Sequence, residues 1–439
     1  MTRMATSGAV RRPRAPHPAS VVALVLAWWR TVVLVLWAAG WFAALAVHGG
    51  GSWHFFATGG RVLADLDDGT TAGLHVYAEH PLLQIGPVAL GLAWALTQLS
   101  AGHGLLAAEA LGTASGAAVV VLVHGIDGRL RRRRGTAARK GAEGPLLLAT
   151  ACFTPVWLYA AISSAHLDDV LALTFCVIAL SCVLSDHPAW AGVAVAAAVD
   201  SKPWALPVTV VLLALPGLRS RAIGVGAAVV GVTAGWLPFF VADPQTIRAM
   251  HYTIVNRPLS GLHLLDPRAA RTPFWDRPLQ TAIGLVLGGV AVWRRRTTGV
   301  LLLVMASRLA LDPGTNRYYT AGLAAGALLW DVAGSRRRWP WWSLTVVLAL
   351  HLARWVPALD PLHGSAMIAF ALAATYVILV GPLRAERPPT IPSGSAGAAP
   401  LHRWAMLTVT SGRAARSGGA GGGRTDLRSS RTAAAGWRL

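Results

Sequence analysis

The stretch PLLLATACFTPVWLYAAISSAHLDDVLALTFCVIALSCVL, residues 145–184, places the polar sequence SSAHLDD between two apolar runs. The runs near 145–163 and 167–184 approach the ~20 residues that carry a helix across ~30 Å of bilayer hydrocarbon. Ionisable groups near that depth are costly and tend to serve a function. The stretch therefore predicts two membrane helices joined by a short turn that presents His166, Asp168 and Asp169.

The same alternation continues through the 439-residue chain, which is 54% hydrophobic and only 13% charged. Because soluble domains carry about 25% charged residues, we expect an all-α, polytopic transmembrane helical bundle over residues 20–383. The number of apolar runs predicts about 12 crossings, within a range of roughly 11–13. Residues 1–19 and 384–439 have the composition of disordered tails.

The connections between the apolar runs are of two kinds, and one kind is arginine-rich. It comprises Arg131 to Arg134, Arg219 with Arg221, Arg294 to Arg296, and Arg336 to Arg338. Basic loops stay in the cytoplasm, so we expect both tails of the chain there. The protein is expected in the plasma membrane, with the polar connections on the outer side. To keep this order, one of the runs 82–99 and 105–123 must either enter and leave the membrane on one side or lie flat on it. We expect that run to be 82–99.

The net charge of +20 also permits binding to a polyanion. Most arginines lie in the short basic loops and the tails, where they set orientation and contact anionic membrane lipids. We therefore expect no nucleic-acid partner.

Two polar sites flank the apolar helices most closely. Asp168 and Asp169 are suited to act as a general base or to position a cation, and the alternative is that one of them only caps the helix after it. Lys202 stands before a helix-breaking proline and needs a partner at that depth. Its partner is either Asp200, in a packing ion pair, or a phosphate at the outer leaflet.

Three further outer segments contain polar residues. The first outer loop, residues 48–81, carries Asp65, Asp67, Asp68, Tyr77 and Glu79. Its segment 55–66 is suited to an amphipathic surface helix, although the Asp67-Asp68-Gly69-Thr70 piece has the composition of an ordinary turn. The segment 242–278 gathers arginines against the positive-inside trend and includes Arg257; the turn LDPGTNRYY includes Arg317 and Tyr318. These groups either hold an anionic ligand or only contact headgroups as a solvated loop and interfacial belt.

This layout resembles the GT-C superfamily of membrane glycosyltransferases, and it is most similar to the bacterial polyprenol-phosphate-mannose-dependent glycosyltransferase family 87. The shared features are a first helix followed by a large outer loop, the sequence VYAEHPLLQIGP at 76–87, the turn SSAHLDD, the Lys202-Pro203 step, and DPGTNRYY. The resemblance covers about residues 28–383. It implies an enzyme that moves a mannose-like sugar from a polyprenyl-phosphate donor to a lipid or glycan acceptor at the outer face.

Within that resemblance, an acid in the first outer loop deprotonates the acceptor, and basic groups hold the donor phosphate. The implied catalytic candidates are Asp168, Asp169, Asp65, Asp68, Glu79 and His54; the implied substrate-binding residues are Lys202, His166, Tyr77, Arg257, Arg317 and Tyr318. The family's acid stands just after the first helix, whereas this chain reads GSWHFF at 51–56 without a carboxylate.

No cofactor or metal is expected, because the leaving group is already a phosphate and the three cysteines lack metal-ligand spacing. Two alternatives to a transferase stay open: a transporter or flippase for a lipid or small anion, and a non-catalytic membrane accessory protein. A transporter is expected to show internal repeats and polar groups near the midplane.

Overall fold

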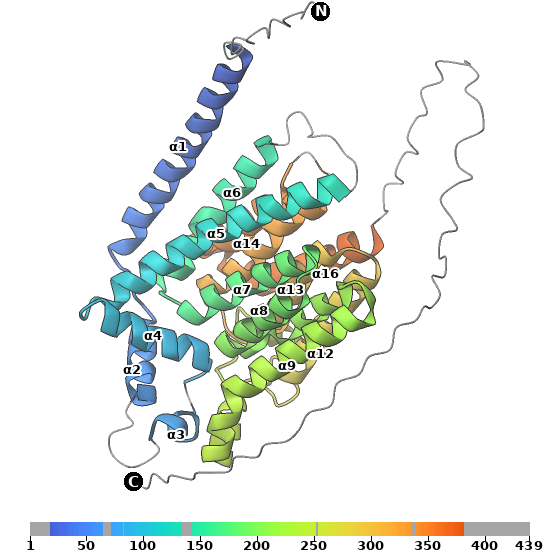
Figure 1. Cartoon of the computed structure of the whole chain (residues 1–439). Coiled ribbons are helices and arrows are strands. Elements are labelled where there is room, and N and C mark those ends of the chain that lie inside the picture. Colours follow the sequence, from blue (N-terminus) through green and yellow to red (C-terminus); the bar gives the residue numbers. More distant parts are fainter. Residues whose placement is uncertain are drawn as a thin grey trace, which may run out of the picture. The chain divides into compact units, whose positions relative to one another are not determined.

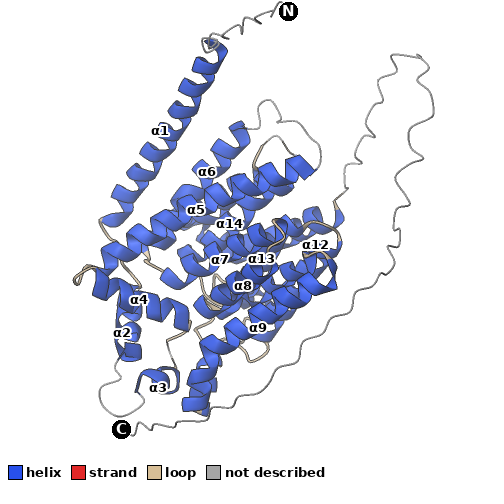
Figure 2. Cartoon of the chain, in the orientation of Figure 1, coloured by secondary structure: helices blue, strands red, loops and turns tan. Residues whose placement is uncertain are grey.

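The structure is a computed structural model that describes residues 18–64, 72–81, 83–133, 143–251, 253–335, 337 and 339–381. These residues belong to one unit, Met1–Pro382. Their regular secondary structure is helical (Figures 1 and 2). An isolated antiparallel bridge between Val255 and Arg271 is the sole extended pairing in this part of the chain.

The α-helices are α1 (Pro18–Ala46), α2 (Trp53–Ala64), α3 (Ala72–Glu79), α4 (Pro87–Leu99), α5 (Gly104–Arg133), α6 (Glu143–Leu158), α7 (Leu167–Leu184), α8 (Pro188–Ser201), α9 (Gly217–Ala242), α10 (Ile247–Met250), α11 (Gly261–Leu265), α12 (Asp276–Trp293), α13 (Val300–Leu311), α14 (Thr320–Leu329), α15 (Trp341–Thr345) and α16 (His363–Thr375). The π-helical turns are η1 (Tyr159–Ser163), η6 (Trp330–Gly334), η7 (Val346–His351) and η10 (Tyr376–Val380). The 3₁₀ segments are η2 (Pro203–Ala214), η3 (Pro244–Thr246), η4 (Thr297–Gly299), η5 (Arg317–Tyr319), η8 (Leu352–Trp355) and η9 (Pro357–Leu362).

Five of these helical stretches are long and apolar enough to cross a membrane: 104–133, 144–163, 167–184, 217–242 and 357–380. Shorter apolar helices occupy 31–46, 87–99, 203–214 and 297–311. The all-α class and the membrane character expected from the sequence are therefore confirmed. The twelve crossings and the orientation of the termini stay predictions.

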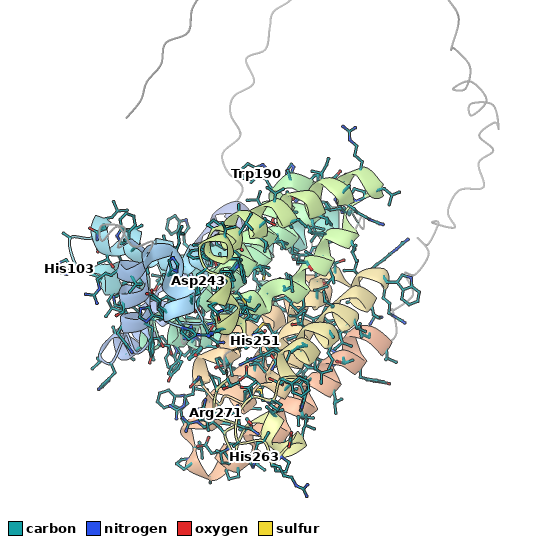
Figure 3. The ribbon with its side chains drawn as sticks, turned by 90° about the horizontal axis from the view of Figure 1, so that it is seen from below. His103, Trp190, Asp243, His251, His263 and Arg271 are labelled. Carbon is teal, nitrogen blue, oxygen red and sulfur yellow. The ribbon has the colours of Figure 1, made fainter. Side chains whose placement is uncertain are left out.

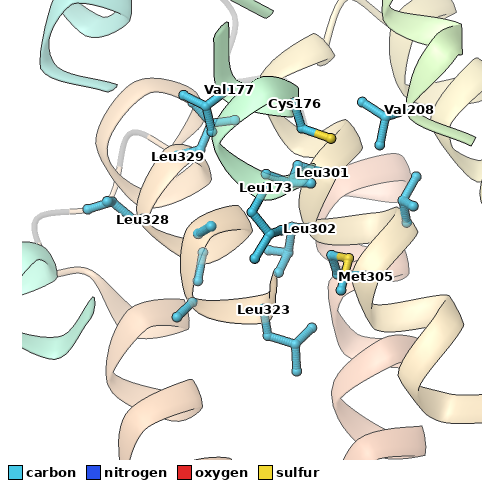
Figure 4. Close-up of a cluster of buried hydrophobic side chains, with 14 of the residues drawn as sticks. Leu173, Cys176, Val177, Val208, Leu301, Leu302, Met305, Leu323, Leu328 and Leu329 are labelled. Carbon is cyan, nitrogen blue, oxygen red and sulfur yellow. The ribbon is translucent and has the colours of Figure 1, made fainter. Parts of the chain in front are cut away.

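The core is formed where α7 packs among α13, α14 and η2 (Figure 4). Leu173 of α7, Leu302 of α13 and Leu329 of α14 are almost completely buried. Between membrane helices the contact energy comes from close packing, because lipid tails are as apolar as leucine. Gly326 of α14 provides such an approach, since a Cβ atom there would lie 2.6 Å from the Cα atom of Leu302.

The two kinds of connection lie at opposite ends of α7. Its first turn carries Asp168 and Asp169, and its last turn contacts arginines of α5. Arg129 donates to the hydroxyl of Ser181 at 3.1 Å, and Arg133 donates to the carbonyl of Leu184 at 2.8 Å. The 18 residues of α7 span about 27 Å at 1.5 Å per residue. The segregation of basic and acidic groups expected from the sequence is thus present along this helix.

Several expected boundaries are wrong. α1 begins at Pro18, inside the expected tail 1–19, and α5 continues through Arg133, where a basic loop was expected. Arginines in the last turn of a helix interact favourably with its C-terminal dipole, which explains the extension of α5. The stretch 341–355 is divided among α15, η7 and η8 instead of forming one continuous α-helix.

The expected loops contain more helix than predicted. The first outer loop folds into α2 and α3, so the helix predicted near 55–66 is found at Trp53–Ala64. The segment 242–278 includes η3, α10, α11 and the start of α12. Run 82–99 contributes only the 13-residue helix α4, which is shorter than a full crossing requires.

Close packing of α8 on α9 gives a first prediction. A Cβ atom on Gly192 would lie 2.2 Å from the carbonyl oxygen of Gly224, whereas one on Gly226 has no neighbour within 4 Å. We expect Gly192→Ala to lower the stability by about 1–3 kcal/mol through overpacking. Gly226→Ala serves as the matched control and is expected to be neutral or stabilising, by up to about 1 kcal/mol. Thermal unfolding of the purified variants in detergent measures the change in stability that each substitution causes. Equal changes for Gly192→Ala and Gly226→Ala would contradict the close packing of α8 on α9.

Candidate active site

The turn before α7 brings Asp168 and Asp169 close together at the start of the helix. The π-helical turn η1 ends at Ser163, and Ala165 adopts a left-handed φ of 45°. His166 is the N-cap residue, which places Asp168 and Asp169 in the first turn of α7. Carboxylates are stabilised there by the positive end of the helix dipole.

The first outer loop is attached to this turn by main-chain hydrogen bonds. The amides of residues 50–52 donate to the carbonyls of residues 162–164, with N···O distances of 2.8–3.1 Å. At the other end of the loop, the Gly86 amide donates to the Ser201 carbonyl at 3.1 Å. A Cβ atom on Gly86 would lie 2.0 Å from the Asp200 carbonyl oxygen, so this approach requires glycine. The loop is thereby held against both segments that carry the polar residues.

Asp168 is the centre of a buried hydrogen-bonded cluster. Its side chain is fully buried. Oδ1 accepts from Nδ1 of His166 at 2.6 Å and from the Asp169 amide at 2.7 Å, and Oδ2 accepts from Nζ of Lys202. Oδ1 of Asp169 accepts from the indole of Trp204 at 2.6 Å. The Lys-Pro-Trp sequence at 202–204 thus serves both carboxylates.

Both basic partners of this cluster, His166 and Lys202, hold their protons more tightly than usual. Burial lowers the pKa of His166, but the charge of Asp168 and the hydrogen bonds to Asp168 and Asp169 together outweigh it, so the net shift of the pKa is upward. Burial also opposes the charge of Lys202, and the carboxylates of Asp168 and Asp169 reverse that effect and raise its pKa. Lys202 therefore remains an ammonium ion across the physiological pH range.

A second charged centre lies next to the first. Arg308 of α13 and Arg277 of α12 each lie 3.6 Å from Oδ2 of Asp312. The guanidinium of Arg308 is buried and stands over the ring of Trp204, 5.3 Å from its centroid. Since Trp204 also bonds Asp169, this indole connects the two centres. Asp276, the residue before Arg277, also interacts electrostatically with both guanidinium groups. The excess positive charge of the cavity therefore comes from Arg257 and Arg271 in its lining.

Both centres face a cavity of about 750 Å³. Its lining includes His166, Asp168, Lys202, Trp204, Tyr318, Tyr319, Arg257, Arg271, Arg277, Gln280 and Arg308. Its apolar lining includes Phe55, Phe56, Leu83, Ile85, Trp236, Met250, Ile254 and Val255. Arg271 comes from the connection between α9 and α12, which Figure 3 shows from below together with His251 and Asp243. Among the described residues of the lining, Asp168 is the only carboxylate.

The structure brings most of the expected site residues to this cavity. His166, Asp168, Lys202, Tyr77, Arg257 and Tyr318 line it. Asp169 adjoins it, since its Oδ2 lies 3.1 Å from Nδ1 of His166. Tyr318 stacks on His166 with ring centroids 3.9 Å apart.

Other expected site residues are placed elsewhere. His54 and Glu79 are exposed and are not part of the lining that the described residues form. Arg317 donates to the Arg354 carbonyl at 2.8 Å and lies over Trp355. Asp65 and Asp68, like Asp67, lie outside the described residues.

The N-cap residue of α7 is His166, but Oδ1 of Asp168 accepts from the free main-chain amide of Asp169 at 2.7 Å. Asp168 therefore satisfies an amide at the start of the helix in addition to its contacts with His166 and Lys202. The expected ion pair of Lys202 with Asp200 is wrong, because Lys202 pairs with Asp168. Lys202 adopts an extended conformation after the end of α8, which turns its side chain from α8 toward α7.

Trp204 was not expected among the site residues. Arg277 and Arg308 belong to the polar segments in which an anionic ligand was expected, but neither was singled out. For Arg308 the spacing was a usable signal, because it stands four residues before Asp312 and both belong to one face of the helix end. For Trp204, the preceding Lys-Pro step was noticed without the indole that follows it. The contact of Arg277 joins α12 to α13 and has no local signal.

The carboxylate cluster also has the composition of a cation site. His166, Asp168 and Asp169 each offer a ligand atom, and these atoms lie within 4.8 Å of one another. No metal cluster was predicted from the sequence, so this grouping of three possible ligands was not expected. Lys202 already brings a positive charge to the same oxygens.

Comparison with protein-family models, with curated proteins and with solved structures gives no match for this chain. The geometry of the cavity is therefore the basis for any functional conclusion.

The buried pair of Asp168 and Lys202 gives a second prediction. Removing one partner of a buried pair costs about 3–5 kcal/mol, because the other charge stays buried. We expect Asp168→Asn and Lys202→Met each to cost that amount and the double variant to cost clearly less than their sum. The partly buried i, i+4 pair Arg131–Asp127, at 2.8 Å on α5, is the control, with a coupling energy of about 0.5 kcal/mol or less. Unfolding in detergent measures both cycles, and additive losses at Asp168 and Lys202 would disprove the pairing.

Proposed function

We propose that this protein is a membrane glycosyltransferase that moves a sugar from a polyprenyl-phosphate donor to a lipid or glycan acceptor at the outer face of the plasma membrane. The observation that carries the proposal is one cavity that combines the Asp168 cluster, an excess of arginine, and an apolar wall. A lipid-linked sugar phosphate has three matching parts: a hydroxyl-rich group, an anion and a hydrocarbon chain.

The anion of the donor matches the arginine centre. Arg277 and Arg308 each lie 3.6 Å from Oδ2 of Asp312, a distance longer than a hydrogen bond. Nε of Arg308 is buried and has no hydrogen-bond partner among the described residues. A phosphate oxygen accepts readily from such guanidinium groups and does so with good geometry.

The chemistry of transfer uses both centres. The acceptor oxygen attacks the anomeric carbon, the bond from that carbon to the phosphate oxygen breaks, and the electron pair leaves with the phosphate. The negative charge that develops on the phosphate is stabilised by the arginine centre, because preorganised cations act strongly where water is excluded. The acceptor hydroxyl must lose its proton to a nearby base.

We assign that base to the pair of His166 and Asp168. Both oxygens of Asp168 already accept from fixed donors. An ionised carboxylate only accepts, so Nδ1 of His166 carries the hydrogen in this pair and Nε2 of the neutral ring is an acceptor. Burial lowers the pKa of His166, but the charge of Asp168 and the hydrogen bonds to the carboxylates outweigh it, so the ring is a stronger proton acceptor than a free imidazole. Phe56 and Tyr318 hold the ring edge-on and face-on.

The position of the cavity agrees with chemistry at one membrane face. The cavity lies at the N-terminal end of α7, and the arginines of α5 lie at the other end. With the basic end in the cytoplasm, the cavity opens toward the outer leaflet. This is where an enzyme meets a translocated lipid-linked donor.

The role of the arginine centre can be tested by charge removal. We expect Arg277→Gln to weaken donor use by about 1.5–3 kcal/mol, the value of a hydrogen bond to a charged group, or roughly ten- to hundredfold. Arg268→Gln is the matched control, because Arg268 is exposed and belongs to the same outer segment without lining the cavity. Membranes with each variant are incubated with labelled polyprenyl-phosphate sugars, and product lipid is counted. Equal transfer by both variants, or no gene-dependent transfer by the parent protein, would sink the proposal.

The proton acceptor gives a separate prediction. Replacing His166 by Gln removes the base and keeps a hydrogen-bond donor for Asp168. We expect the rate of transfer to fall about 10²–10⁴-fold, the usual contribution of a general base, with donor binding retained. Single-turnover transfer and binding of labelled donor to the purified protein separate the two. A variant that retains its rate would remove His166 from the reaction.

A further inference from the structure

One carboxylate oxygen of the acidic cluster, Oδ2 of Asp169, has no hydrogen-bond donor among the described residues. This oxygen is buried. It lies 3.1 Å from Nδ1 of His166, but the single hydrogen on that nitrogen is directed to Asp168 at 2.6 Å. Oδ2 of Asp169 is therefore left facing the cluster interior.

The nearest full positive charge to that oxygen is Lys202. Its Nζ is bonded to Oδ2 of Asp168 and lies 3.9 Å from Oδ2 of Asp169. The ammonium thus stands against one oxygen of each carboxylate. Its position is fixed by the main chain, because Lys202 is extended at the end of α8 and is followed by Pro203.

We propose that Lys202 is a tethered cation that occupies a latent divalent-metal site formed by His166, Asp168 and Asp169. One imidazole nitrogen and two carboxylate oxygens form a common ligand set for Mn²⁺ and Zn²⁺, with water completing the coordination. Nδ1 of His166 lies 2.6 Å from Oδ1 of Asp168 and 3.1 Å from Oδ2 of Asp169, so a single ion can contact all three atoms once it displaces the hydrogen on Nδ1 to solvent. The adjoining cavity supplies room for the water ligands.

The ammonium excludes a metal ion for two reasons. It occupies an oxygen lone pair that a metal needs, and its charge repels a second cation at close range. The natural protein therefore balances its carboxylates with its own side chain and needs no ion from solution.

This inference does not rest on the proposed transfer reaction, because it concerns the charge balance of the cluster alone. For a transferase it has one consequence, which is that a metal chelator leaves transfer unchanged. A protein without any transfer activity would give the same metal-binding result. The failure of either proposal is thus distinguishable from the failure of the other.

The experiment measures binding of Mn²⁺ to the full chain in detergent, by loss of the electron paramagnetic resonance signal of free Mn²⁺. We expect Lys202→Ala to bind one Mn²⁺ per chain at least tenfold more tightly than the parent protein. Lys202→Arg retains a cation and is the matched control, with binding no tighter than the parent. Adding Asp169→Asn to Lys202→Ala removes a ligand and is expected to weaken binding about 10–100-fold, a loss as large as that seen even for outer-shell partners of metal ligands.

A second variant covers the case in which Lys202→Ala does not fold. Lys202→Met keeps the length of the side chain and removes only its charge, so it is expected to bind Mn²⁺ as well. A neutral variant that folds only with Mn²⁺ present also supports the inference, because the ion then restores the lost balance. Parent binding as tight as that of Lys202→Ala, absence of binding in both neutral variants, or failure of both to fold even with Mn²⁺ would overturn it.

Discussion

The constraint on which this structure depends is the complete burial of the Asp168 carboxylate at the end of a membrane helix. A buried ionised group is tolerated only with close partners, and each partner of Asp168 comes from a position that the backbone fixes. His166 is held by the left-handed turn at Ala165, and Lys202 by the break between α8 and Pro203. The arrangement of α7, α8 and η2 is therefore also the arrangement of the charges.

The same contacts join the carboxylate cluster to the rest of the cavity. Trp204 follows Lys202 by two residues, bonds Asp169 through its indole nitrogen, and presents its face to Arg308. A chain segment of three residues thus carries a cation to one centre and an aromatic surface to the other. Displacement of η2 would disturb both centres together, so the two are coupled through one local structure.

The sequence predicts the helical class, the apolar segments and the turn SSAHLDD because each depends on local hydropathy and spacing. It also places His166, Asp168 and Lys202 among the site residues. It does not predict that Lys202 pairs with Asp168, 34 residues away, instead of with Asp200, because that choice depends on the extended conformation at the end of α8. The extension of α5 through Arg133 was missed for a related reason, since a basic run can form either the last turn of a helix or a loop.

The segment that follows the first helix and the turn before α7 line the same cavity, and the acidic group in its lining comes from the turn. The chain lacks a carboxylate just after its first helix, but residues 50–52 are hydrogen-bonded to residues 162–164. A group on residues 51–56 and a group on the turn before α7 therefore face the same cavity, which Ser52 and Phe56 line together with Asp168. In the proposed reaction the base on the turn before α7 can act beside residues 51–56, because the two segments are neighbours in space. The loop then contributes its backbone and its aromatic rings, and the turn contributes the proton acceptor.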